Sequence, residues 1–143
     1  MISIRAAQGT DQSLNRIAGL MSATRQALND GWDESGAIVS KELVRILTTG
    51  PRTGRVYTIR GRKHQASAPG EPPAKLTGAL ARSVDHKVTG WHTMQVGEEA
   101  DYAGYLEKGT GRIAPRPHLT VAVNLTKVTV MDVLVRHLRD IHL

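Results

Sequence analysis

Residues 11–49 read DQSLNRIAGLMSATRQALNDGWDESGAIVSKELVRILTT, and their apolar side chains recur at spacings of three, four or seven. The members of this stripe are Leu14, Ile17, Ala18, Met21, Leu28, Trp32, Val39, Leu43 and Ile46. Such spacing places side chains on one face of an α-helix. Gly50-Pro51 ends the pattern, because glycine favours a helix stop and proline cannot continue the helix. The segment therefore predicts one N-terminal helix, with Thr10 or Asp11 as its cap.

This helix is long for a chain of 143 residues. Unbroken, it would span about 58 Å at ~1.5 Å per residue, which exceeds the size of a compact domain. Either Asn29-Asp30-Gly31 bends or breaks it, or it projects into a neighbouring subunit. Because the apolar stripe keeps its phase across Gly31, we expect a long helix with Gly31 as the place of any bend.

The rest of the chain predicts short elements that complete a single α+β domain over residues 1–143. Alternating apolar residues indicate short strands at 2–7, 56–59, 83–89 and 92–97, the last two forming an antiparallel pair around Gly90-Trp91. Short helices are expected after Thr77 and between Asp101 and Gly109, with Thr77 and Asp101 as their caps. Residues 118–139 fit a strand at first, but their helical stripe continues for twenty residues, so we expect a C-terminal helix.

An extended segment at 50–76, basic and proline-rich, interrupts these elements. It holds four of the six prolines and a cluster of five cations, namely Arg52, Arg55, Arg60, Arg62 and Lys63. Two interpretations stay open for the cations: a solvated loop, or a tongue that contacts DNA or an acidic partner subunit. Only Tyr57 is available for base stacking, so any contact with DNA would be to phosphates and independent of sequence.

Composition limits the class of protein. There is no cysteine, which excludes disulfide scaffolds and cysteine-ligated metal sites and suits a reducing cytoplasm. With no Phe and 3% aromatic residues, the core must be aliphatic. The net charge of +6 favours a polyanion or an acidic partner. The sequence predicts no signal peptide at its start and no membrane contact, since no apolar run approaches ~18 residues.

Catalytic and metal motifs are not found. The six histidines lack the HxxxH and HExxH spacings of metal sites. The run Gly104–Thr110 reads GxxxxGT but lacks the lysine of a phosphate-binding loop. The acidic trio Glu98, Glu99 and Asp101 is expected to be a solvated turn. We therefore expect no enzymatic activity, no metal and no cofactor, and a small nuclease is only a weak alternative.

Three short stretches, in this order, carry a family resemblance: SAPGEPPAKLTGALARS at 67–83, YAGYLEKGT at 102–110 and APRPHL at 114–119. The set resembles the tail-completion, or head–tail joining, proteins of long-tailed bacteriophages, which are minor tail components of the neck. The resemblance implies an α+β fold and a structural ring, expected to be hexameric, at the junction of head and tail. It covers about residues 10–135, and the basic insert at 51–66 aligns least well.

The resemblance also implies partners and an interface. The neighbours would be head-closure or connector proteins and tail tube or tail terminator proteins, with non-specific contact to packaged DNA, in a virion assembled in the host cytoplasm. Residues expected at subunit interfaces are Pro69, Gly70, Pro72, Pro73, Tyr102, Tyr105, Leu106 and Arg116. The tyrosines and Leu106 could instead be core residues, and the proline run could be an ordinary rigid linker. The alternative function is sequence-independent nucleic-acid binding.

Overall fold

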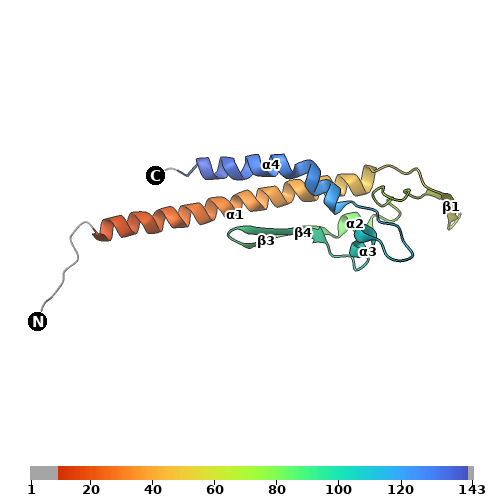
Figure 1. Cartoon of the computed structure of the whole chain (residues 1–143), viewed down its shortest axis with the longest axis horizontal. Helices are drawn as coiled ribbons and strands as arrows, with labels where there is room; N and C mark the ends of the chain where they lie inside the picture. The colour runs from red at the N-terminus through yellow and green to blue at the C-terminus, as the bar shows by residue number, and fades with distance from the viewer. Residues whose placement is uncertain (1–9, 142–143) are drawn as a thin grey trace, which may run out of the picture.

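The computed structural model describes residues 10–141 and has an α+β fold dominated by one helix (Figure 1). That helix, α1 (Thr10–Thr49), runs for 40 residues without a break, so it is about 60 Å long at ~1.5 Å per residue. The prediction of a long N-terminal helix is confirmed. Because Thr10 is already helical, the prediction that Thr10 or Asp11 caps the helix is wrong. The strand predicted at 2–7 lies outside the described residues.

The C-terminal helix α4 (Leu119–Arg139) confirms the helical interpretation of its segment and packs along the second half of α1 (Figure 1). The helices approach closely at Gly31, where an added Cβ atom would lie 3.2 Å from the Leu134 side chain. Glu34 of α1 ties the end of α4 with a 2.5 Å ion pair to Arg136 and a 2.8 Å contact to His137. Gly31 therefore serves helix packing inside an unbroken helix.

A β-hairpin also packs against α1. Its strands β3 (Val84–Gly90) and β4 (Thr93–Glu98) pair antiparallel, as the sequence predicts, and Trp91 and His92 form the turn. His86 of β3 lies against α1, with Nδ1 3.3 Å from the hydroxyl of Ser40. The alternation of half-buried and exposed residues along both strands shows that one face of the hairpin is turned inward.

The buried core is small and aliphatic, as the lack of Phe predicts. It lies where the last turns of α1 meet the short helices and the start of α4, and it consists of Leu43, Ile46, Leu47, Leu80, Ala103 and Ala122. Within residues 10–141, no helix is both long enough and apolar enough to cross a membrane.

The basic segment contains a second hairpin, and the sequence predicted only one of its two strands. Strand β1 (Val56–Ile59) is confirmed, but β2 (Arg62–Gln65) was expected as loop because it is polar throughout. The turn between them has positive φ angles at Arg60 (49°) and Gly61 (78°), which suits the tight turns of two-residue hairpins. The hairpin lies at one end of the molecule, far from the start of α1 (Figure 1).

Two short helices complete the fold. In α2 (Ala79–Arg82) the cap position is Gly78, although the Thr77 hydroxyl still accepts the Ala79 N–H at 3.3 Å. In α3 (Ala103–Lys108) the cap position is Tyr102, so the prediction that Asp101 caps this helix is wrong by one residue. The predicted stop at Gly109 is confirmed, with φ 73° and ψ 178°.

Candidate functional site

The three stretches that carry the family resemblance meet at one place. We call this place the motif junction and define it by Ser67, Glu71, Glu107, Arg116 and His118. Two backbone hydrogen bonds hold the stretches together: Gly70 donates to the Pro115 carbonyl at 2.9 Å, and Arg116 donates to the Leu106 carbonyl at 2.7 Å. The three stretches, which are separate in sequence, are thus in direct contact in the folded chain.

Arg116, which lies just before α4, binds the proline-rich segment at 67–74, which we call the strap. Its Nη1 donates to the carbonyl and hydroxyl oxygens of Ser67, and to the Ala68 carbonyl at 3.2 Å. Ser67 is buried. Glu71 stabilises the same strap by accepting the Ala68 N–H at 2.8 Å and the Thr53 hydroxyl at 2.5 Å. The guanidinium of Arg116, predicted at a subunit interface, therefore binds within its own chain.

Glu107 caps α4 from a separate helix. Its carboxylate accepts the backbone N–H groups of His118 at 2.8 Å, Leu119 at 3.0 Å and Thr120 at 2.9 Å, and the Thr120 hydroxyl at 2.5 Å. Burial alone would raise the pKa of Glu107, but these hydrogen bonds outweigh it and hold the pKa below 4.5. A negative charge at this position also favours the N-terminal end of the α4 dipole.

His118 lies between two carboxylates with none of its surface exposed. Nδ1 is 2.8 Å from the Arg116 carbonyl and 3.1 Å from Oε2 of Glu107. Nε2 is 3.0 Å from Oε1 of Glu98, an ion-pair distance at an angle outside ordinary hydrogen-bond geometry. Burial lowers the pKa of His118, but Glu98, the Arg116 carbonyl and Glu107 outweigh burial and raise the pKa above 6.5. The site thus favours an imidazolium ion.

Glu98 corrects the expectation of a solvated acidic turn. Its side chain is 4% exposed, whereas Glu99 and Asp101 are exposed. The signal was present in the sequence, because Met94 and Val96 alternate inward along β4 and Glu98 is the next residue in that period of two. Glu107 and His118 gave no such signal, since their contact depends on the path of the loop between α3 and α4.

The centre of the motif junction is closed to a substrate. His118 has no exposed surface, so no ligand can reach its ring without unfolding the junction. Within residues 10–141 no group of three or more His, Asp or Glu side chains is placed to hold a metal ion. The buried histidine and the two carboxylates beside it contact one another within the chain, and this cluster acts to fix the shape of the fold.

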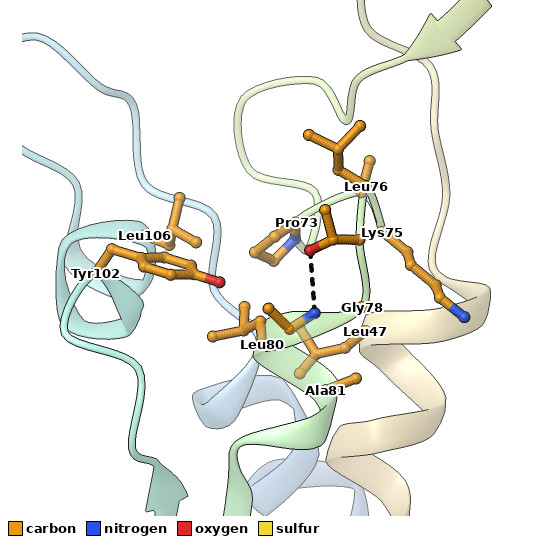
Figure 2. Close-up of a pocket in the computed structure, with 12 residues that line it drawn as sticks. Leu47, Pro73, Lys75, Leu76, Gly78, Leu80, Ala81, Tyr102 and Leu106 are labelled. Carbon is orange, nitrogen blue, oxygen red and sulfur yellow. Dashed lines mark hydrogen bonds between the residues drawn. The ribbon is translucent and has the colours of Figure 1, made fainter. Parts of the chain in front are cut away.

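Three of the predicted interface residues line one apolar cleft. Tyr102 at the start of α3 and Leu106 within α3 face Pro73 of the strap across a cavity of about 250 Å³ (Figure 2). Leu47 and Leu80 lie at its base (Figure 2). Leu76 completes the wall and is itself exposed. The cleft is therefore open to solvent and apolar, as a pocket for a partner's side chain would be.

The other predicted interface residues are more scattered. Pro69 and Gly70 are exposed at the turn of the strap, and Pro72 is half-buried behind it. Tyr105 is exposed and does not line the cleft. Because Tyr102 and Tyr105 are both exposed, neither is a core residue.

All five predicted basic contact residues are exposed, but only three gather closely. Arg60, Arg62 and Lys63 surround the turn of the β1–β2 hairpin and line an open hollow that extends to Leu76. Arg52 lies at the base of the segment, where it donates to the Thr48 carbonyl at 3.3 Å. In the described part of the chain, none of the five forms an ion pair with an acidic side chain.

Two accessible features of residues 10–141 are thus an apolar cleft and a basic hairpin tip. Both are surfaces that fit contact with a macromolecule. No protein-family model, curated protein or solved structure matches the chain.

Proposed function

We propose that the chain is a structural subunit of the head–tail junction of a long-tailed bacteriophage, where copies form a ring that joins or completes the tail. One observation carries the proposal: the stretches 67–73, 102–110 and 114–119 bind one another in the motif junction. The residues that resemble the family therefore stabilise the fold of the chain by binding one another. Such a pattern supports a structural role, because His118 is fully buried and the charged side chains of the junction bind groups of the same chain.

The surface of the chain supports assembly. Large apolar side chains are exposed along α1, beside α3 and along α4, in addition to the open cleft at Pro73. Monomeric soluble proteins rarely expose extended apolar patches, and such patches mark interaction surfaces. A subunit that is covered on several sides by neighbours, as in a ring between two other rings, accounts for this distribution.

The basic hairpin supports contact with an acidic neighbour in the neck. Arg60, Arg62 and Lys63 project together without internal acidic partners, so they are free to form ion pairs that guide register. Tyr57 is the one aromatic residue of the hairpin, and its ring packs edge-on against His64 at 5.3 Å. The same tip also favours the alternative function, sequence-independent binding of nucleic acid through phosphates.

Native mass spectrometry of the purified chain, alone and with the tail tube protein of the phage or prophage that encodes it, tests the proposal. We expect a closed oligomer, of six subunits by the family resemblance, formed alone or on addition of the tube protein. Electron microscopy of virions should place the same ring in the neck. A chain that stays monomeric with the tube protein and is found only as an isolated monomer in virions would contradict the proposal.

A second prediction separates the two roles of the hairpin. Changing Arg60, Arg62 and Lys63 together to Ser is expected to impair joining of tails to heads while leaving DNA binding by the isolated protein unchanged. If the tip instead contacts DNA, the slope of log affinity against log salt should flatten by about 0.9 for each lost phosphate contact.

The matched control changes Lys41, Lys87 and Arg112 to Ser. These three residues are exposed elsewhere on the chain, so the variant loses the same charge without touching the hairpin. Infectious particles at normal yield from the hairpin variant, with unaltered DNA binding, would refute both roles.

A further inference from the structure

The first third of α1 carries an apolar stripe that no other helix or strand in residues 10–141 covers (Figure 1). The end of α4 lies beside Ala23 and Ala27, where the side chains of both helices line one hollow. Before that point α1 projects alone (Figure 1). Leu14, Ile17 and Met21 are 59%, 54% and 53% exposed there.

This stripe continues the line along which α1 is buried in its own fold. An α-helix repeats its direction every 18 residues, or five full turns. Leu14 therefore points as Trp32 does, and Met21 points as Val39 does. Val39 is buried, in the half of α1 that packs against α4 and the β3–β4 hairpin (Figure 1). The exposed stripe therefore continues the buried face of α1 beyond the part that is covered.

A second apolar stripe faces away from the fold on α4. Val128, Met131, Val135 and Leu138 are all exposed, with Val128 at 65% and Met131 at 60%. They lie opposite the buried side of this helix, which includes Ala122, Thr126 and Val133. The stripe cannot contact α1 of the same chain, because the opposite side of α4 already does.

The two stripes match in spacing. On α4 the residues follow one another in steps of three, four and three, and on α1 the series Leu14, Ile17, Met21 and Thr24 has the same steps. Spacings that alternate between three and four place knobs where two helices can interlock along a shallow crossing. Each series spans about 15 Å at ~1.5 Å per residue.

The charge of the projecting segment argues against a membrane or a nucleic acid as the partner that covers the α1 stripe. Residues 10–30 carry two acids, Asp11 and Asp30, and two bases, Arg16 and Arg25, so the projecting segment is neutral overall. A helix that lies on an anionic membrane or on nucleic acid is enriched in Lys and Arg on its polar face. The partner is therefore one that offers apolar area at helical spacing.

We propose that the occupant is a second copy of this chain, and that the α1 stripe of one copy packs on the outward α4 stripe of the next. This inference rests on the proposed ring and names the surfaces that close it. Because the two surfaces differ, each copy offers one to each neighbour, and such head-to-tail contacts generate rings when the rotation closes.

Disulfide cross-linking tests the pairing, because the chain has no cysteine of its own. Met21→Cys and Met131→Cys chains are mixed and oxidised, and cross-linked pairs are separated on a non-reducing gel. We expect mixed pairs that contain one chain of each kind. A chain with both substitutions should form a ladder of covalent multimers that ends at the size of the ring.

The matched control is Ser22→Cys mixed with Met131→Cys. Ser22 is also exposed but points about 100° away from Met21 around the helix, so it should cross-link several-fold less. As an independent readout, Ile17→Glu should weaken oligomerisation and leave the thermal midpoint of the monomer unchanged, since exposed substitutions rarely shift stability by more than about 0.5 kcal/mol.

The failures of this inference and of the proposed function are distinguishable. If native mass spectrometry finds a ring but Met21→Cys links only to itself, or links no better than Ser22→Cys, the pairing of α1 with α4 is wrong and the ring stands. If no oligomer forms with or without the tube protein, the ring itself fails and the pairing fails with it.

Discussion

Replacing His118 with alanine is expected to lower the free energy of unfolding by about 3–5 kcal/mol, the usual effect of removing one partner from a buried ion pair. The imidazole ring is fully buried and lies within 3.1 Å of carboxylate oxygens of both Glu98 and Glu107, which raise its pKa and favour its charged form. Without it, the nearly buried Glu98 loses its cation, and the Arg116 carbonyl loses a donor. The loss should appear in urea unfolding followed by circular dichroism.

His92→Ala is the matched control, because His92 is exposed in the β3–β4 turn and its loss should change stability by no more than about 0.5 kcal/mol. Adding Glu98→Gln to His118→Ala should recover part of the loss, since it removes the charge left unpaired. Equal stability of the wild-type and His118→Ala chains would show that the buried cluster contributes nothing to the fold.

The pH dependence of this difference identifies the charged histidine. The pKa of His118 is raised in the folded state, so its contribution is complete below 6.5, the ordinary value, and is lost as pH rises through the folded pKa. The pKa of Glu107 is lowered, so its contribution is complete above 4.5 and is lost as pH falls through the folded value. The destabilisation by His118→Ala should therefore be largest between pH 4.5 and pH 6.5. It should decrease as the pH rises through the folded pKa of His118, and also as the pH falls through the folded pKa of Glu107.

Gly109→Ala should destabilise the fold by about 3 kcal/mol, because its backbone conformation is almost exclusive to glycine and alone costs other residues about 1–3 kcal/mol. With φ 73° and ψ 178°, an added Cβ atom would lie 2.7 Å from the Ile113 carbonyl oxygen and 2.8 Å from the Pro115 nitrogen. Both contacts are with backbone, which cannot rotate away. The shift would displace the loop that brings Arg116 and His118 to Glu107.

Gly104→Ala provides the control for this substitution. Gly104 lies inside α3 with no atom within 4 Å of an added Cβ, so alanine there should stabilise the helix by up to about 1 kcal/mol. Thermal unfolding of the two variants should therefore move in opposite directions. A Gly109→Ala chain with the wild-type midpoint would mean that the loop accommodates the side chain.

Periodic segments were predicted well, whereas contacts of segments without a periodic pattern were not. The helices α1 and α4 follow from apolar spacing over many turns, and the β3–β4 hairpin follows from alternation around Gly90. Strand β2 was missed because Arg62–Gln65 has no apolar residue, and only its pairing with β1 makes it a strand. Helix caps were misplaced by one residue at Thr77 and Asp101, because the cap positions are Gly78 and Tyr102 and neither helix is capped by the side chain at that position.

The sequence identified the segments that form the candidate site, but it did not predict the contacts between them. The stretches at 67–83, 102–110 and 114–119 were marked as important, yet several of their residues were expected to face other subunits. Arg116 instead binds Ser67 across 49 positions of sequence, and His118 reaches Glu98 across a loop. Such contacts depend on the path of the chain in space, which no local pattern encodes.

The cap that Glu107 provides for α4 has a consequence for how the molecule opens. The first amides of α4 are held by a carboxylate from another helix, so this end cannot fray while α3 stays in place. Loss of α3 would in turn free those amides and expose the charge of Glu107 at once. The segment from Ala103 to the first turn of α4 therefore behaves as one cooperative unit, whose amide protons exchange with solvent together or not at all.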